Sequence, residues 1–466
     1  MTFRPAAVMF TLTIPLAAAS STPARAQTAA PPPSPLAFEE ALRQLHDQNE
    51  TIRASDLLVE QRRQERAAAK GLLWPTVTLG AAGVQLSSPI EARFSLEPLA
   101  ALLPIQLPPL PTIEIELQQS RFAQSSLTGR WLLYSGGKVQ AATAAAGARV
   151  DEAIAEDRRT RESTETMLVR FYFGAQLQAR ARDVRAEALK ALDTLAYNAK
   201  RLEEEGIIAR TERLSADVAR ADGDRQLKAA ESDVELARIA LASLLTLDDV
   251  GPLTTPLFIS EDLPPVEAFV TSMRERHPAL AQVRAQQALA AEALNGARGA
   301  YKPDVFLFGR QTLAKVGLGD LLPRGAYGIG ATFTVFDGPT RKKRVAAADL
   351  QTQRAAQLGS RAERDLATLV RQKYRELLKA RDQYHTLATA LDLAQENVRA
   401  RTRAFDEGLA TTLEVVDARV QLSRIQTERV AAAYAAIVAL AELLEASGQS
   451  DQFEQHRLQG KEVGAP

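Results

Sequence analysis

The sequence has no cysteine and only four histidines among its 466 residues. The absence of cysteine excludes disulfide bonds and a lipid anchor on an N-terminal cysteine, and it removes the main ligand for soft metals. Basic and acidic residues balance at 57 each, so no excess of positive charge indicates a nucleic-acid partner. Beyond the N-terminal segment, no run approaches the roughly 20 apolar residues that a transmembrane helix needs.

The sequence also lacks the patterns of catalytic sites. It contains no nucleophile elbow, no phosphate-binding loop and no paired-cysteine site. The histidines are scattered along the chain, at His46, His277, His385 and His456. We therefore predict that the protein is not an enzyme, has no catalytic residues, and binds neither a cofactor nor a metal.

Residues 1–26 have the features of a secretory signal peptide. Arg4 supplies a positive charge, the following segment up to Ala19 is largely apolar, and Ala24-Arg25-Ala26 fits a small-x-small cleavage site. The sequence therefore predicts an exported mature chain that begins at Gln27.

The most informative pattern that is present is an internal repeat. A shift of 202 residues places Tyr134 on Phe336, and it also places Gly206 on Gly408 and Glu212 on Glu414. Such a repeat predicts that two copies of one structural unit stack side by side. We expect a first repeat at 27–250, a proline-rich linker at 251–265, a second repeat at 266–447, and a polar C-terminal tail at 448–466.

The pattern within each repeat predicts a helix, a pair of strands and a long helical hairpin. The expected fold is therefore mostly α with some β. The expected strands are 76–86, 121–134, 304–313 and 327–336. The expected helices are 36–73 with a break near Asn49, 138–205, 209–247, 266–301 with a break at His277-Pro278, and two more at 339–407 and up to 447. A helix of about 68 residues would be on the order of 100 Å long, which suits a rod, a tube or a bridge.

The segment 327–336 alternates between large apolar residues and glycine or threonine. Its apolar face fits either the core of a soluble sheet or the lipid-facing side of a membrane barrel, and the pattern alone leaves both open. Four strands cannot close a barrel wide enough for a solute, and an open sheet edge is not tolerated in lipid. The membrane interpretation therefore requires partner chains.

Taken in order, these segments resemble the TolC-like outer-membrane efflux protein family over essentially the whole mature chain. The resemblance depends on Leu73-Trp74-Pro75 and Tyr301-Lys302-Pro303, which lead into strands, and on Tyr134-Ser135-Gly136-Gly137 and Phe336-Asp337-Gly338, which lead out of them. It also depends on a spaced pattern: a glycine, an acidic residue six positions after it, and a small residue ten positions after it. Gly408, Glu414 and Ala418 form this pattern, and Gly206, Glu212 and Ala216 repeat it.

The resemblance implies a homotrimer whose strands form a 12-stranded outer-membrane barrel, continued by a helical periplasmic tunnel with a collar at mid-length. The linker and both chain ends should lie near the collar, and the loop at 88–120 should face the exterior. The implied function is a passive exit duct of a tripartite efflux or type I secretion system. The implied partners are a periplasmic adaptor (membrane fusion protein), an inner-membrane pump and outer-membrane lipid. The cargo stays open between small molecules and proteins.

The candidate functional residues lie at the turns of the helical hairpins. Glu212 and Glu414 are acids in the first turn of a helix, where they stabilise the N-terminus and need no further role. In a trimer, however, each acid becomes a ring at the narrow end of the tunnel, where like charges attract cations. By the resemblance, Glu414 and Asp417 form the acidic entrance and Thr211 and Glu212 line the neighbouring helix pair.

The remaining tip residues have structural interpretations. Gly206 and Gly408 are expected to be helix stops with left-handed backbone. Phe405 and Ala410 stand where the family carries a tyrosine and an arginine that tie the entrance shut by hydrogen bonds, which these side chains cannot make.

Two other functions compete with the duct. A periplasmic adaptor also contains a helical hairpin, but it needs one hairpin flanked by small barrel domains rather than two strand-hairpin units. A structural coiled-coil protein of the cell envelope would contain no strands.

Overall fold

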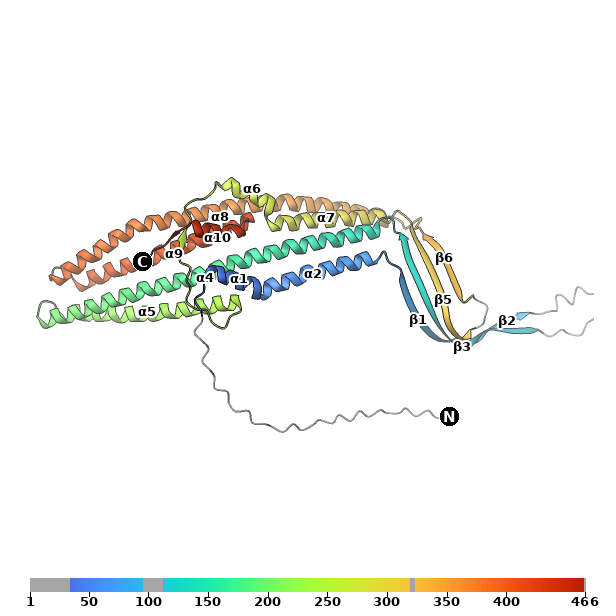
Figure 1. Ribbon diagram of the computed structural model, residues 1–466, viewed down its shortest axis with the longest axis horizontal. Helices are drawn as coiled ribbons and strands as arrows, with labels where there is room; N and C mark the ends of the chain where they lie inside the picture. The colour runs from blue at the N-terminus through green and yellow to red at the C-terminus, as the bar shows by residue number, and fades with distance from the viewer. Residues whose placement is uncertain (1–33, 95–111, 319–322, 465–466) are drawn as a thin grey trace, which may run out of the picture.

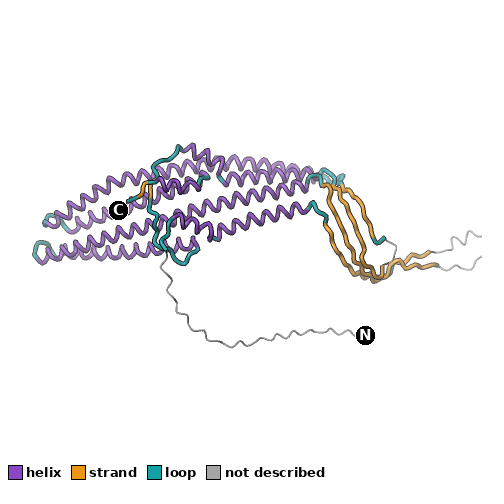
Figure 2. The backbone as a smooth tube through the Cα atoms, in the orientation of Figure 1, coloured by secondary structure: helices purple, strands orange, loops and turns teal. Residues whose placement is uncertain are grey.

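The chain forms a long rod of helices with a curved β-sheet at one end (Figures 1 and 2). The computed structural model describes residues 34–94, 112–318 and 323–464. The expected signal peptide at 1–26 lies outside these residues, as does the proline-rich part, 95–111, of the expected exterior loop at 88–120.

The two repeats contain helices of identical length. Four pairs of helices have 11, 22, 67 and 36 residues. The first repeat comprises α1 (Phe38–Gln48), α2 (Glu50–Gly71), α4 (Lys138–Glu204) and α5 (Arg210–Leu245). The second repeat comprises α6 (Val266–Arg276), α7 (Pro278–Gly299), α8 (Thr340–Asp406) and α9 (Thr412–Ser447). The sequence repeat is therefore a structural repeat.

The breaks within the two shorter helical runs are caused by capping residues. The Asn49 side chain accepts hydrogen bonds from the backbone N–H groups of Thr51 and Ile52, at 3.0 and 3.2 Å, and so begins α2. In the second repeat, His277 Nδ1 accepts from the N–H of Ala279 at 3.1 Å, and Pro278 occupies the first helical position. Both breaks fall where the sequence predicts them.

The long helices α4 and α8 each have 67 residues and are therefore about 100 Å long. α4 packs against α5, and α8 packs against α9, as two antiparallel hairpins (Figure 1). Along α8, residues spaced by seven point into these contacts: Val370, Leu377, Leu391 and Phe405 are all buried. The heptad spacing that the sequence shows is therefore a packing seam.

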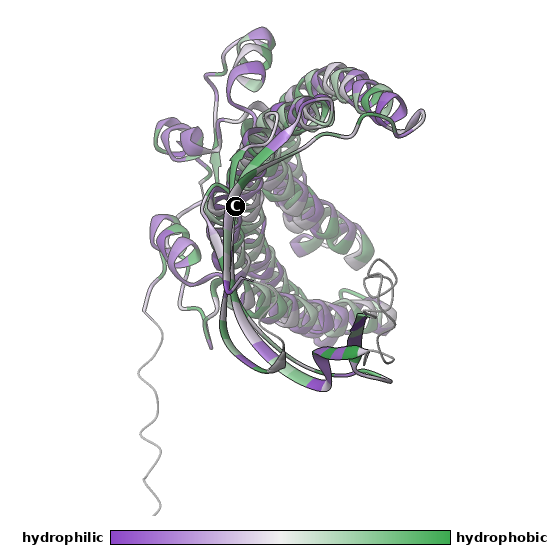
Figure 3. Cartoon of the chain, turned by 90° about the vertical axis from the view of Figure 1, so that its right-hand side faces the viewer, coloured by the Kyte–Doolittle hydropathy of each residue, from purple (hydrophilic) through white to green (hydrophobic). Residues whose placement is uncertain are grey.

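The sheet contains four long strands in the order β1-β3-β5-β6, all antiparallel. They are β1 (Thr76–Gln85), β3 (Ile113–Tyr134), β5 (Asp304–Leu318) and β6 (Gly325–Thr332). A short strand, β2 (Ile90–Phe94), pairs with the outer end of β3. Viewed along the rod, the sheet and the helices follow one open arc (Figure 3).

Three strand boundaries differ from the sequence prediction by four residues or more. β3 begins at Ile113 rather than near Arg121, because β2 offers it a partner. β5 continues to Leu318 rather than ending at Leu313. β6 ends at Thr332 rather than Phe336, because its last partner is Asp304, which follows Pro303 at the start of β5. Pairing across strands, which a single segment cannot reveal, decides all three.

The two faces of the sheet differ in chemistry. Residues opposite each other on neighbouring antiparallel strands share a face. One face is apolar and carries Val77, Leu79, Leu127, Trp131, Leu307, Tyr327 and Ile329. The other carries Thr76, Thr78, Thr128, Arg130 and Arg310, with Phe306 and Phe308 filling the space over two glycines of β6. Leu79 and Ile329 are each 68% exposed, so no layer formed by the described residues covers the apolar face.

A compact collar packs against the rod near mid-length. Here the linker strand β4 (Phe258–Ile259) pairs with β7 (Lys461–Glu462), and Leu36 bridges Leu253. Tyr172 on α4 is fully buried; its hydroxyl donates to the Leu36 carbonyl at 2.8 Å and accepts from the Thr255 N–H at 3.0 Å. The linker and the described ends of the chain therefore meet at the collar, as the resemblance implies.

The C-terminal segment is more structured than the expected polar tail. After α9 it forms a 3-10 turn (Ser450–Gln452), the helix α10 (Phe453–Gln459) and β7. Phe453 joins the rings of Phe38, Phe173 and Phe258 in the collar core. Val463 is also buried in this core, so two apolar residues, which the overall polarity of the segment hides, hold it on the collar together with the pairing of β7.

Among the described residues, one helix is long and apolar enough to cross a membrane by composition, contrary to the prediction that no segment is. This helix is α9, and 67% of its most apolar window is buried. Its apolar side chains pack against α4, α6 and α8 in the collar. The length and hydropathy of α9 are therefore explained by its position in the core.

Candidate functional site: the tip of the helical hairpins

The two hairpin turns lie at the end of the rod farthest from the sheet (Figure 1). Gly206 has φ = 77° and Gly408 has φ = 72°. The N–H groups of Ile207 and Leu409, which follow these glycines, donate back to the carbonyls of Leu202 and Ala404 at 2.8 and 2.7 Å. This pattern ends a helix with one left-handed residue, and glycine adopts that conformation without steric penalty.

Glu212 connects the two hairpins. It lies in the first turn of α5, and its Oε2 accepts a hydrogen bond from the backbone N–H of Thr412, the first residue of α9, at 2.8 Å. A carboxylate at this position satisfies an N–H that has no partner within its own helix and also stabilises the positive end of the helix dipole. Glu212 therefore caps a helix of the other repeat.

Glu414 and Asp417 lie on the first turns of α9 but differ in their surroundings. The Glu414 carboxylate pairs with Arg401 of α8 at 2.8 Å. Asp417 is exposed and makes no hydrogen bond or ion pair with any residue that the structure describes. Thr211 is also exposed, and only its carbonyl is used, as the acceptor for Ser215 Oγ at 3.0 Å. The structure gathers all four predicted residues at the tip, but only Glu212 bridges the hairpins.

An apolar cluster beneath these polar residues holds the four helices together. It consists of Leu192, Leu195, Ala196, Ala199, Leu202, Ala216, Phe405 and Val415. Phe405 is 1% exposed, and Ala410 packs against the cluster. The sequence indicated only that Phe405 cannot make a closing hydrogen bond; the structure shows that it is a central packing residue of the tip.

Charged residues that the sequence analysis did not single out strengthen the same region. Arg213 pairs with Glu203 across the α4–α5 turn, at 2.5 Å, and with Asp217 one helical turn further along α5. The spacing of Arg213 and Asp217, four residues apart on a helix, is a signal that the sequence contains. Glu203 is brought into contact only by the turn.

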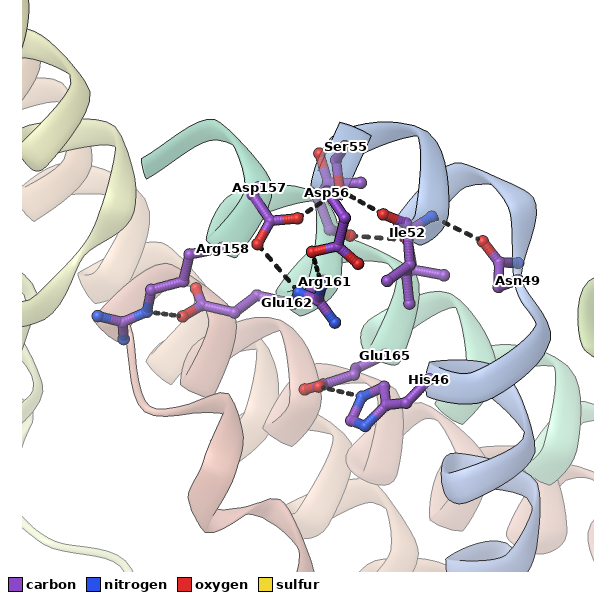
Figure 4. Close-up of polar contacts among 12 residues, drawn as sticks. His46, Asn49, Ile52, Ser55, Asp56, Asp157, Arg158, Arg161, Glu162 and Glu165 are labelled. Carbon is purple, nitrogen blue, oxygen red and sulfur yellow. Dashed lines mark hydrogen bonds and ion pairs between the residues drawn. The ribbon is translucent and has the colours of Figure 1, made fainter. Parts of the chain in front are cut away.

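A second polar cluster lies where α2 packs on α4, next to the collar (Figure 4). Ser55 donates to Asp157 at 2.5 Å, and Arg161 joins Asp157 to Asp56. At the next positions of α4, Arg158 pairs with Glu162 at 2.7 Å. Glu162 is 7% exposed, and burial raises the pKa of its carboxyl from 4.5 to about 7, although the charge of Arg158 partly opposes this shift.

Glu162 should make stability depend on pH. Because its folded-state pKa is raised, it contributes stability below pH 4.5 that is lost as the pH rises through about 7. Replacing Glu162 by glutamine should remove this loss and raise the free energy of unfolding at pH 8 by up to about 3 kcal/mol. Thermal unfolding from pH 5 to pH 8 tests this, with the exposed Glu156→Gln on the same helix as control. Parallel pH profiles for wild type and Glu162→Gln would contradict it.

A four-stranded sheet with one apolar and one polar face, extended by two hairpins about 100 Å long, defines a subunit of an export duct that spans the outer membrane and projects into the periplasm. The comparison with protein families agrees. Residues 41–246 and 270–449 match the outer membrane efflux protein family, and the chain belongs to this family. It is therefore an outer-membrane channel protein of an efflux system and not an enzyme.

Solved structures share the fold across most of the chain. The outer membrane protein VceC of Vibrio cholerae matches with a TM-score of 0.69 and 16% identity, over 88% of this chain and 96% of that one. The open-state outer membrane channel MtrE of Neisseria gonorrhoeae matches with a TM-score of 0.70 and 19% identity, over 89% of each chain. A search of curated proteins by sequence finds no match.

Proposed function

We propose that three copies of the chain close their sheets into one barrel and form a passive duct from the periplasm to the exterior. The observation that carries the proposal is the uncovered sheet, whose apolar residues are exposed on one face while threonine and arginine line the other. Lipid suits the first face and water the second. Among the strands that the structure describes, β1 and β6 each keep one unpaired edge, which lipid does not tolerate.

The contact between the two repeats supplies a template for the contact between chains. In one chain, β3 pairs with β5 and α4 packs against α7. In the repeat, β6 and α8 correspond to β3 and α4, and β1 and α2 correspond to β5 and α7. The equivalent contact between β6 and α8 on one side and β1 and α2 on the other is not made within one chain as the structure describes it. Trp131 lies opposite Leu307 in the β3–β5 pair. The equivalent register therefore sets Phe333 opposite Leu79 of the partner subunit.

The trimer is testable by mass and by cross-linking. In mild detergent the particle mass should be three times that of the mature chain, and a monodisperse monomer with native strand content would contradict the proposal. Because the chain has no cysteine, Phe333→Cys combined with Leu79→Cys introduces only these two thiols. Oxidation should link these chains into covalent trimers. The control pair Phe333→Cys with Val84→Cys, offset along β1, should give far fewer links.

We further propose that the tip acids form the periplasmic entrance. Asp417 carries an unpaired charge at the start of α9, whereas Arg401 partly neutralises Glu414. Three copies would gather these carboxylates around one narrow opening and attract cations. Glu212 would have a different role, since its bond to Thr412 ties the hairpins that must separate when the entrance widens.

Neutralising the acids should change ion selectivity. At a separation of a few ångströms, the interaction free energy of two unit charges is on the order of 1 kcal/mol. An attraction of this size between a carboxylate and a cation changes the partition of the cation into the entrance roughly fivefold. Glu414→Gln with Asp417→Asn should therefore lower cation selectivity several-fold in planar-bilayer recordings, with Asp417→Asn causing most of the change. Expression and assembly should be unchanged, because exposed first-turn acids contribute only tenths of a kcal/mol.

A matched control for this pair is Asp392→Asn with Glu396→Gln, which removes the same charge from exposed positions of α8 farther from the tip. If both double variants keep wild-type selectivity, Glu414 and Asp417 serve only as helix-start acids.

The turns also offer a contact for a periplasmic adaptor that would join the duct to an inner-membrane pump. Ile207 and Leu409, one on each turn, are 56% and 78% exposed. Large exposed apolar side chains at the end of a rod are favourable contacts for a partner protein.

A further inference from the structure

All four helices that join the sheet meet it in one narrow zone (Figure 1). α2 and α7 end there, and α4 and α8 begin there. The zone carries many cations: Lys70, Lys138, Arg298, Lys302 and the consecutive Arg341, Lys342, Lys343 and Arg344. The linking segments 70–76, 134–140, 298–304 and 333–345 contain only two acids, Asp304 and Asp337.

Both acids are already paired. Lys138 contacts Asp304 at 2.7 Å, and Arg341 contacts Asp337 at 3.0 Å. The other cations are exposed, and their side chains have no hydrogen bond or ion pair with any described residue. We call these the basic girdle: Lys70, Arg298, Lys302, Lys342, Lys343 and Arg344. The girdle is a band of uncompensated positive charge next to the sheet.

The cations on α8 are unfavourable for the helix that carries them. The N-terminus of a helix carries a partial positive charge, so that acids are favoured there and cations are disfavoured. The first turn of α8 contains no acid, and Arg341 to Arg344 follow one another directly after Thr340. Local helix stability therefore does not explain these residues, and an external anion would.

Consecutive helical residues are about 100° apart, so the three unpaired cations of α8 point in widely different directions. Whichever side of α8 faces the tunnel or a neighbouring chain, at least one of these side chains reaches the outer surface. Lys70 and Arg298 add cations at the ends of α2 and α7, so that the charge follows the rim of the sheet rather than one helix.

Aromatic residues mark the same level as a membrane boundary. Trp74, Tyr301 and Phe336 lie in the linking segments and are 75%, 48% and 87% exposed. Aromatic side chains gather at the membrane–water interface of barrels, where a ring can contact both acyl chains and headgroups. Apart from Lys302, which follows Tyr301, the girdle residues lie on the helical side of these rings, which is the side of the lipid headgroups in the periplasmic leaflet.

We propose that the basic girdle binds the phosphate groups of anionic phospholipids in the periplasmic leaflet of the outer membrane. This inference rests on the proposed insertion of the sheet in that membrane. Each lysine or arginine near an anionic surface is worth about 1 kcal/mol, or about a fivefold preference for the anionic lipid. The bound lipid offsets the repulsion at the start of α8 and holds the rod at a fixed depth below the barrel.

The internal repeat shows that the cluster on α8 is not required by the fold. The residues at the equivalent positions of α4 are Val139, Gln140, Ala141 and Ala142. α4 has the same length and enters the sheet region in the same way. The first repeat thus forms the same junction without the three unpaired cations.

The two tryptophans of the chain provide a local probe, since Trp74 and Trp131 both lie near the girdle, with Trp131 Nε1 donating to the Leu73 carbonyl at 2.9 Å. Purified trimer is placed in vesicles that contain phosphatidylglycerol and phosphatidylethanolamine in fixed proportion. In one preparation the phosphatidylglycerol chains are brominated, and in the other the phosphatidylethanolamine chains are. Bromine quenches nearby tryptophan, so the two preparations report which lipid lies at the junction.

Wild type should be quenched by brominated phosphatidylglycerol about two- to fivefold more, per mole fraction, than by brominated phosphatidylethanolamine. The variant Lys342→Gln with Lys343→Gln and Arg344→Gln should lose most of this preference. The control Arg354→Gln with Arg364→Gln and Arg375→Gln removes three exposed, unpaired cations from the same helix, at least about 15 Å further along, and should keep the preference. High salt should weaken the wild-type preference.

Equal quenching by both lipids in wild type would overturn the girdle as a lipid site, as would an unchanged preference in the girdle variant. Competition by inorganic phosphate at constant ionic strength would assign the site to free phosphate instead. The absence of quenching by either lipid would overturn the insertion of the sheet itself. The two proposals therefore fail in different ways.

Discussion

The Gly136→Ala variant is expected to lose most of its trimer from the outer membrane. Gly136 has φ = 65°, and a Cβ atom there would lie 2.6 Å from the Gly299 carbonyl oxygen and 2.6 Å from Lys302 Cβ. The left-handed backbone costs alanine about 1–2 kcal/mol, and the overlap with fixed atoms adds about 1–3 kcal/mol. The exit from β3 and the end of α7 would have to separate, which disrupts the contact between the two repeats.

Gly137→Ala is the matched control for this change. Gly137 has φ = 90°, so the backbone penalty is similar, but nothing lies within 4 Å of an added Cβ. Heat-modifiable migration of outer-membrane fractions measures the amount of trimer. Equal trimer levels in the two variants would show that the close contact of Gly136 with Gly299 is not needed for assembly.

Phe405→Ala is expected to loosen the tip while leaving the collar and the sheet intact. Removing a fully buried phenylalanine costs about 3–5 kcal/mol, because the cavity is only partly filled by relaxation. Phe405 packs with residues from α4, α5 and α9, so that both hairpins lose support at once. We expect faster amide exchange in residues 192–216 and 405–418, and a higher single-channel conductance.

Two substitutions separate packing from the other properties of the tip. Phe405→Leu keeps most of the apolar volume and should remain close to wild type. Leu409→Ala removes a side chain that is 78% exposed and should leave amide exchange unchanged. If amide exchange at the tip of the Phe405→Ala variant stays as slow as in wild type, polar contacts such as that of Glu212 with Thr412 hold the hairpins together without the apolar cluster.

The helices could be predicted closely because their signals are local. Asn49 and His277-Pro278 interrupt helical runs through bonds to backbone groups two or three residues away, and Gly206 and Gly408 end helices through their own backbone conformation. The strands could be predicted only in part. The length of β3 depends on β2, and the end of β6 depends on where β5 begins.

The candidate site shows the same division. The spacing from each turn glycine led to Glu212, Glu414 and Asp417 at the tip. Their partners were not predictable, since Thr412 lies two hundred residues from Glu212, and Arg401 reaches Glu414 only because the chain reverses at Gly408. Phe405 drew attention for the hydrogen bond it cannot make, whereas its contacts with three other helices explain why it is apolar.

By itself, the sequence determined the internal repeat, the lengths of the helices, the breaks within them and the family to which the chain belongs. These features depend on periodic and capping signals that act within a few residues. The tertiary structure alone decided which face of the sheet is apolar, which acid bridges the hairpins, and that unpaired cations at the ends of α2, α7 and α8 lie in one band. These features depend on contacts between segments that are distant in the chain. The free energy that stabilises them comes from both partners of each contact, so no single segment of the sequence reveals it.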